Sequence, residues 1–154
     1  MADNSQVLPC VLIPVTDRQL LLPNVSIAEI VDYAEPEAAD GGPEWLIGYL
    51  NWRGLRLPVI SYDAANGGQG ARPDGARGRI AVLNTISDSH QAMPFLAMVT
   101  QGIPSQTKLA EPEIQQVEGD TGPADLMVVD VEGHTAYIPN LEYLESLAAK
   151  SFAA

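Results

Sequence analysis

The stretch from Tyr49 to Ser61, YLNWRGLRLPVIS, concentrates residue types that recognise other molecules. Trp52, Arg53 and Arg56 lie in an otherwise apolar setting, and tryptophan and arginine are enriched at the hot spots of protein interfaces. A guanidinium can also pair bidentately with a carboxylate on a partner. These residues are therefore candidates for a docking surface. The alternative is a structural hairpin whose arginines pair with acids of the same chain.

The local pattern around these residues predicts a β-hairpin. Two apolar runs, Leu46 to Trp52 and Leu55 to Ser61, are joined by Arg53-Gly54, and a two-residue connection containing glycine is typical of a tight turn. Pro58 lacks a ladder donor, which favours an edge or bulge position. Strict alternation predicts two largely apolar faces, one with Ile47, Tyr49 and Asn51 and the other with Leu46, Gly48, Leu50 and Trp52.

Elsewhere the residues that could perform catalysis do not form a recognisable arrangement. His90 and His134 are far apart, with no second ligand at a metal-binding spacing, and no Gly-x-Ser-x-Gly motif occurs. Glu142 and Glu145 are three residues apart on an expected helix, which is typical of a solvated face rather than of an acid/base pair. The sequence gives no positive indication of an enzyme.

Two loops also lack the features of ligand sites. The segment from Gly67 to Arg79 carries three arginines but not the Gly-Lys-Ser/Thr ending of a phosphate loop, so a flexible connector from Asn66 to Arg79 is expected. Glu35, Glu37 and Asp40 lack the ligand order of a calcium loop. No metal or cofactor is expected.

Composition and charge restrict the class of partner. The net charge of −12 would repel nucleic acid and anionic membrane surfaces, and the proline- and glycine-broken apolar runs do not suit membrane insertion. The single cysteine, Cys10, is expected to be a buried and inert thiol in a reducing, cytoplasmic setting. Hydrophobic residues make up 46% and charged residues only 18% of the chain, against about 25% charged in a typical domain, so more apolar surface must remain outside or be covered by a partner.

The remaining pattern predicts a mostly β, barrel-like fold of one domain, residues 1–154, or two small subdomains with a common core. The segments Glu29 to Glu44 and Gly102 to Pro123 read as a solvated loop and an irregular segment. Asn140 is expected to cap a helix from Leu141 to Lys150. The expected strands are Val7 to Val15, Gln19 to Leu22, Val25 to Tyr33, the two hairpin runs above, Ile80 to Ile86, Phe95 to Thr100, Leu126 to Val131 and His134 to Ile138. Glu132-Gly133 between the last two strands predicts a second tight hairpin.

The hairpin resembles a known family. The stretches Gly48 to Gly54 and Leu57 to Ile60 resemble the signature of CheW-like domains, coupling proteins of bacterial chemosensory arrays, in which Gly-x-apolar-Asn-x-Arg-Gly precedes Pro-apolar-apolar. Val25 to Ile30 and Ala136 to Leu147 resemble the family's early strand and its closing strand and helix. The family pattern continues with Asp-Leu, whereas Ser61-Tyr62 stands here. This departure indicates a divergent branch, such as the ChpC or PilI type that serves type IV pilus systems.

The resemblance implies two packed five-stranded Src-homology-3-like barrels with a C-terminal helix, no catalytic activity and no cofactor. It implies a cytoplasmic adaptor at receptor arrays that couples methyl-accepting chemoreceptors to a CheA-type histidine kinase in chemotaxis or twitching motility. Arg53 is expected to matter most, either by contacting a partner or by holding the hairpin shape. A small-ligand-binding or enzymatic β-barrel remains the alternative, and a deep pocket converging on His90 or His134 would favour it. The candidate partner-binding residues are Asn51, Trp52, Arg53, Gly54 and Arg56.

Overall fold

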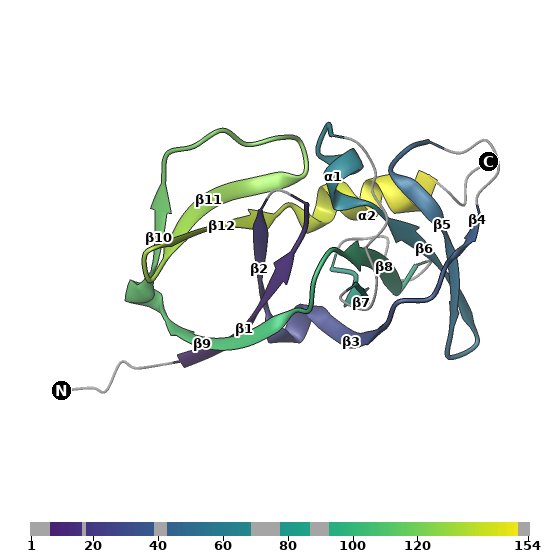
Figure 1. Ribbon diagram of the computed structural model, residues 1–154, viewed down its shortest axis with the longest axis horizontal. Coiled ribbons are helices and arrows are strands. Elements are labelled where there is room, and N and C mark those ends of the chain that lie inside the picture. Colours follow the sequence, from purple (N-terminus) through teal and green to yellow (C-terminus); the bar gives the residue numbers. More distant parts are fainter. Residues whose placement is uncertain (1–6, 17, 39–42, 69–77, 87–92, 151–154) are drawn as a thin grey trace.

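The computed structural model describes residues 7–16, 18–38, 43–68, 78–86 and 93–150. It has two six-stranded sheets, which we name sheet A and sheet B, lying side by side on the left and right of Figure 1. The predicted mostly β fold of two packed Src-homology-3-like units is therefore confirmed, with open sheets of six strands in place of closed five-stranded barrels. Sheet A has the strand order β10-β11-β12-β2-β1-β9, and sheet B has the order β3-β7-β8-β6-β5-β4.

The strands of sheet A come from both ends of the chain, and those of sheet B from the segment between them. Sheet A contains β1 Val7–Pro14, β2 Gln19–Pro23, β9 Ser105–Ala110, β10 Ile114–Val117, β11 Asp125–Val131 and β12 His134–Pro139. Sheet B contains β3 Ile27–Asp32, β4 Glu37–Ala38, β5 Leu46–Trp52, β6 Leu55–Ile60, β7 Arg79–Asn84 and β8 Phe95–Thr100. The chain therefore crosses from sheet A to sheet B after β2 and returns after β8.

The helical elements occupy the junction of the sheets and two turns. The α2 helix, Leu141–Lys150, has the predicted bounds, and Asn140 caps it by accepting a hydrogen bond from the Tyr143 amide at 3.1 Å. The short α1 helix, Tyr62–Ala65, begins directly after β6, where the Ser61 hydroxyl accepts a hydrogen bond from the Ala64 amide. The 3₁₀ turns are η1 Asn24–Ser26 and η4 Glu111–Glu113.

One hydrophobic core joins the two sheets. Its largest cluster combines Ile13 and Leu20 of sheet A with Ile60 and Leu96 of sheet B, and Leu144 of α2 completes it. All of these side chains are at most 1% exposed. Burying them against one another stabilises both sheets together, at about 25 cal/mol for each Å² of apolar surface removed from water.

The two turns predicted from a glycine at the second central position are both tight turns. Arg53 and Gly54 have φ values of 48° and 80°, and Glu132 and Gly133 have 52° and 89°. Positive φ at both central residues is the requirement of a type I′ turn, whose twist matches that of the flanking strands. The predicted hairpins β5–β6 and β11–β12 are confirmed in their antiparallel pairing.

Two predictions about loops are wrong. The segment from Gly102 to Pro123 was expected to be irregular, but it forms β9, η4 and β10, which lie at the two ends of sheet A. The solvated loop expected from Glu29 to Glu44 instead begins with β3 residues and includes β4. The strand β3 lies within the predicted strand Val25 to Tyr33, but β4, β9 and β10 were missed. Most side chains of these three strands face solvent and are polar or acidic, so they lack an apolar stripe.

Pro58 was expected at an edge or a bulge, and the edge alternative is wrong because β6 lies between β5 and β8. Parallel pairing with β8 involves only Val59 and Ile60, so Pro58 lies just outside that ladder. The neighbouring strand β5 has a register shift between Leu46 and Gly48. Strict alternation fails there, and Ile47 and Trp52, expected on opposite faces, both enter the second core cluster.

Single polar side chains also differ from expectation. Glu145 was predicted on a solvated face, but it is 1% exposed and its carboxylate accepts a hydrogen bond from the Ile86 amide at 2.7 Å. Asn66, expected in a flexible connector, caps α1 and bonds to the loop before β11; residues 69–77 of that connector lie outside the described residues. Cys10 is buried as predicted, and burial raises the pKa of its thiol.

Glycine is required at position 48 because β4 lies directly against it. A β-carbon at Gly48 would meet the Glu37 carbonyl oxygen at 2.2 Å, which is impossible without moving the backbone of β4. Among the described residues, β4 pairs with β5 through Glu37 with Tyr49 and Ala38 with Gly48. The glycine at position 48, the first residue of the hairpin motif, is therefore explained by the close approach of the β4 backbone.

We predict that Gly48→Ala detaches β4 from β5 and lowers the free energy of unfolding by about 1–3 kcal/mol, the usual effect of a forced overpacking. Amide hydrogen exchange at residues 37–38 and chemical denaturation measure the two effects. Glu37→Ala is the matched control, because it removes only a side chain and leaves the backbone fit intact. Equal exchange in Gly48→Ala and wild type would show that the close approach does not determine the position of β4.

Candidate functional site

The candidate site is the tip of the β5–β6 hairpin, which projects at the lower right of Figure 1, at the end of the molecule away from sheet A. The type I′ turn places Arg53 and Gly54 at the tip, and both are exposed. Asn51 and Arg56 face each other across the strands just behind the turn, and both are also exposed. The structure thus brings four of the five predicted site residues to one exposed end of sheet B.

Trp52 is the fifth predicted residue, and it is 8% exposed. Its ring packs edge-on against Phe95 of β8, with the centroids 4.9 Å apart and an interplanar angle of 66°. Its indole Nε1 donates a hydrogen bond to Glu29 Oε1 of β3 at 2.9 Å. Trp52 is therefore an anchor of the hairpin in the core of sheet B rather than an exposed contact.

The same Glu29 oxygen also accepts a hydrogen bond from Arg53, the arginine at the tip. Arg53 Nη2 donates to Glu29 Oε1 at 3.1 Å, and the guanidinium carbon lies 4.7 Å from the centroid of the Trp52 ring. Since β3 and β4 are the two edge strands of sheet B and β5 is the neighbour of β4, this contact links one edge of the sheet to the hairpin near the other edge. Glu29, Trp52 and Arg53 therefore connect β3 to the hairpin through side chains.

A second ion pair lies on the β4 side of the hairpin. Arg56 Nη2 lies 2.5 Å from Glu37 Oε1, and the Arg56 guanidinium carbon is 4.0 Å from the centroid of the Tyr49 ring. The pairing of hairpin arginines with acids of the same chain, one of the two readings of the sequence, is therefore observed. It does not bury the arginines, since the side chains of Arg53 and Arg56 remain 68% and 54% exposed.

This arrangement is suited to recognition. The two guanidinium groups are oriented by a ring and a carboxylate each, and the half-exposed Leu55 and Leu50 lie beside them. Because exposed ion pairs contribute only about 0–1 kcal/mol, a partner carboxylate can compete for either arginine at little cost. The tip can therefore offer oriented cations and apolar contact area at once.

The other candidate residues do not assemble into a site for catalysis. His134 is exposed at the start of β12, and His90 lies outside the described residues. In the part of the chain that the structure describes, no group of three or more histidine, cysteine, aspartate or glutamate side chains is arranged to hold a metal ion. Within the same residues, no helix combines the length and the apolar character needed to cross a bilayer.

A half-open hollow of about 630 Å³ lies in sheet A and includes His134 in its wall. Leu12, Val131 and Ala136 contribute apolar lining, while Arg18 and Glu132 contribute charge. The hollow is open rather than enclosed, and the described part of the chain brings no second histidine to it. It therefore falls short of the deep pocket that would favour a ligand-binding or enzymatic barrel.

Sequence reasoning missed Glu29 and Glu37 as parts of the site, because both lay in the segment expected to be a solvated loop. The signal in the sequence was that this acidic segment precedes a hairpin with two arginines. That pattern predicts ion pairs between the two segments, but it does not identify which acids form them. Glu29 lies 24 residues before Arg53 and Glu37 lies 19 before Arg56. Only the fold selects these partners.

We predict that Glu29→Leu destabilises the protein more than Glu29→Gln. Glutamine keeps an acceptor for the Trp52 indole and loses only an exposed ion pair, a cost of about 0–1 kcal/mol. Leucine leaves the part-buried indole N–H without its acceptor, a further cost of about 1–3 kcal/mol. Urea denaturation of the two variants measures the difference, and equal stabilities would show that the Trp52 bond contributes nothing.

The chain is similar to known proteins in sequence and in structure. The model of the CheW-like domain matches residues 9–147. The crystal structure of the scaffolding protein TtCheW from Thermoanaerobacter tengcongensis superposes with a TM-score of 0.74 at 14% sequence identity, covering 92% of this chain and 89% of that one. No curated protein matches the sequence at a significant level. Membership supports, in general terms, a role as a chemotaxis coupling adaptor, and the chain belongs to the CheW-like domain family.

Proposed function

We propose that this protein is a non-enzymatic chemosensory adaptor that couples methyl-accepting chemoreceptors to a CheA-type histidine kinase in the cytoplasm. The observation that carries the proposal is the hairpin tip, where a family motif is displayed on an exposed turn instead of being enclosed by its own chain. The low charged fraction of the chain and its exposed apolar side chains agree with a surface that partners cover.

Within this proposal, the site residues have two kinds of role. Trp52 and Gly54 set the shape of the tip, through burial against Phe95 and through a positive φ. Asn51, Arg53 and Arg56 present polar and cationic groups to a partner. Arg53 does both, because it bonds to Glu29 while its side chain stays 68% exposed.

The pathway is a finer proposal. Ser61 and Tyr62 replace the Asp-Leu of the family pattern, and we assign the chain on that basis to the branch that serves type IV pilus systems and twitching motility. Ser61 supports α1 as an N-cap, a role that aspartate can also fill, so the replacement preserves the local fold while changing the chemistry. Identification of the kinase and receptor recovered from native lysate with the tagged protein tests the pathway.

Small-ligand binding is the second candidate, and the hollow beside His134 is the observation that favours it. Adaptor function is preferred because the hollow is open and because the family motif lies on the other sheet. The two candidates differ in where substitutions act, since changes at the hairpin tip would leave the hollow intact.

We predict that Arg53→Glu weakens binding to the kinase about tenfold or more without unfolding the protein, since it removes the guanidinium and places a second acid beside Glu29. Isothermal titration with the CheW-homologous domain of the kinase measures the affinity, and circular dichroism verifies the fold. Lys108→Glu is the control, because it makes the same charge change at an exposed position of sheet A. Equal affinity for wild type and Arg53→Glu would remove the hairpin tip from the kinase interface.

A further inference from the structure

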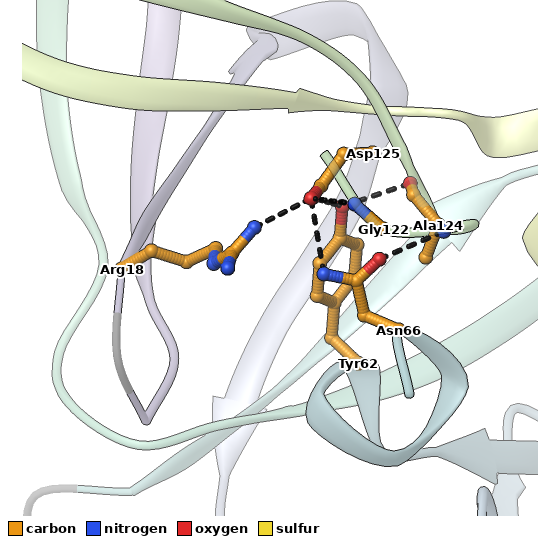
Figure 2. Close-up of polar contacts among 6 residues, drawn as sticks. All are labelled: Arg18, Tyr62, Asn66, Gly122, Ala124 and Asp125. Carbon is orange, nitrogen blue, oxygen red and sulfur yellow. Dashed lines mark hydrogen bonds and ion pairs between the residues drawn. The ribbon is translucent and has the colours of Figure 1, made fainter. Parts of the chain in front are cut away.

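A buried carboxylate lies where the two sheets meet. Figure 2 shows Asp125 at the centre of a polar cluster that we name the Asp125 cluster: Arg18, Tyr62, Asn66, Gly122, Ala124 and Asp125. The Asp125 side chain is 0% exposed. It accepts hydrogen bonds from four donors, Arg18 Nη1 at 2.5 Å, the Tyr62 hydroxyl at 2.6 Å, Asn66 Nδ2 at 3.0 Å and the Gly122 amide at 2.9 Å.

The donors belong to different parts of the fold. Arg18 is the last residue of the turn between β1 and β2, and Asp125 begins β11, so both lie on the sheet A side of the junction. Tyr62 begins α1 and Asn66 caps it, and this helix is the direct continuation of β6 of sheet B. Two of the four hydrogen bonds to Asp125 therefore cross from one sheet to the other.

Further bonds in the cluster run across the same junction. The Ala124 amide donates to Asn66 Oδ1 at 2.8 Å, and the Tyr62 hydroxyl also lies 2.8 Å from the Ala124 carbonyl oxygen. Arg18 is held in addition by the Tyr137 ring, 4.0 Å from its guanidinium carbon. Among the described residues, no buried side-chain nitrogen or oxygen is left without a hydrogen-bond partner. The cluster is complete, which is the condition for a buried polar network to specify one geometry.

The charge state of the cluster is fixed by the same contacts. Burial opposes the charged form of Asp125, but hydrogen bonds from Tyr62, Gly122 and Asn66, with the charge of Arg18, lower the pKa of this carboxyl below its ordinary value. Burial and the hydrogen bond to Asp125 raise the pKa of the Tyr62 phenol. Asp125 is therefore an anion and Tyr62 a neutral donor around neutral pH, so the cross-sheet bonds are charge-assisted.

We propose that the Asp125 cluster is a clamp that fixes the orientation of sheet A relative to sheet B. The shared apolar core holds the sheets together, but hydrophobic contact is non-directional and tolerates small rotations. Hydrogen bonds to one buried carboxylate have set directions and lengths, so they select one orientation. Tyr62 is central because its single hydroxyl lies within hydrogen-bond distance of both Asp125 and the Ala124 carbonyl oxygen across the junction.

Only one consequence of the clamp, its effect on complex assembly, rests on the proposed adaptor function. An adaptor that bridges two partners must present its two halves at a fixed angle, so Tyr62 and Asp125 act as positioning residues for the assembled complex without touching either partner. Loss of the clamp is expected to leave affinity for the kinase alone within about twofold, because the hairpin tip belongs wholly to sheet B. It is expected to lower formation of the ternary complex with receptor about tenfold, which corresponds to losing one charge-assisted hydrogen bond.

The deciding experiment measures the distance between the sheets. Spin labels at Asp32→Cys of β3 and Gln116→Cys of β10 report this distance by pulsed electron resonance; both positions are exposed, whereas Cys10 is 2% exposed and shielded from labelling. Tyr62→Phe removes the hydroxyl with no loss of ring packing, and the double variant Tyr62→Phe/Asn66→Ala removes both side-chain donors from sheet B. We expect a wider distance distribution for Tyr62→Phe and a still wider one for the double variant.

Asp130→Asn is the matched control, because Asp130 lies on the same strand but accepts its hydrogen bond from Gly133 within its own hairpin. Its distance distribution should equal that of the wild type. Should the double variant fail to fold, Tyr62→Phe decides alone, with amide exchange at Ala124 expected to rise about tenfold. Unchanged distances and exchange in folded Tyr62→Phe would overturn the clamp. If wild type binds neither kinase nor receptor, the proposed function fails while the distances still decide the clamp.

Discussion

The shared core between the two sheets is the constraint on which the rest of the structure depends. Each sheet has only six short strands, and the largest cluster of buried side chains draws on both sheets and on α2. A small sheet has little apolar surface to bury by itself. The two halves therefore gain stability because side chains of both sheets are buried in one shared hydrophobic core. The hairpin tip, at the far end of sheet B, is then free to be exposed.

That freedom explains how a strongly acidic chain can present cations. With a net charge of −12, the protein surrounds its few basic groups with a negative field, and both hairpin arginines lie against a carboxylate of the chain. Such exposed pairs add little stability, but together with the Trp52 and Tyr49 rings they limit the rotamers that the arginines adopt. Less side-chain entropy is then lost when a partner binds, which favours recognition without a deep pocket.

Local rules predicted the parts of the fold that local chemistry determines. The two type I′ turns follow from Arg53-Gly54 and Glu132-Gly133, where glycine accepts a positive φ, and α2 follows from its apolar spacing and the Asn140 cap. The hairpin at the site was predicted for the same reason. The edge strands β9 and β10 could not be predicted, because a strand with polar side chains facing water has the composition of a loop, and only its backbone pairing reveals it.

The buried polar residues required distant partners that the sequence does not name. Glu145 bonds to the Ile86 amide across 59 positions, and Asp125 bonds to Tyr62 across 63. A carboxylate on a helix is normally expected to face solvent. It can be buried only when another element of the fold places a hydrogen-bond donor against it. Tyr62 illustrates the consequence for function: as a sequence departure it only suggested divergence, whereas in the fold its hydroxyl reaches the other sheet. A residue that departs from a family pattern is therefore most informative when its new atoms find partners elsewhere in the fold.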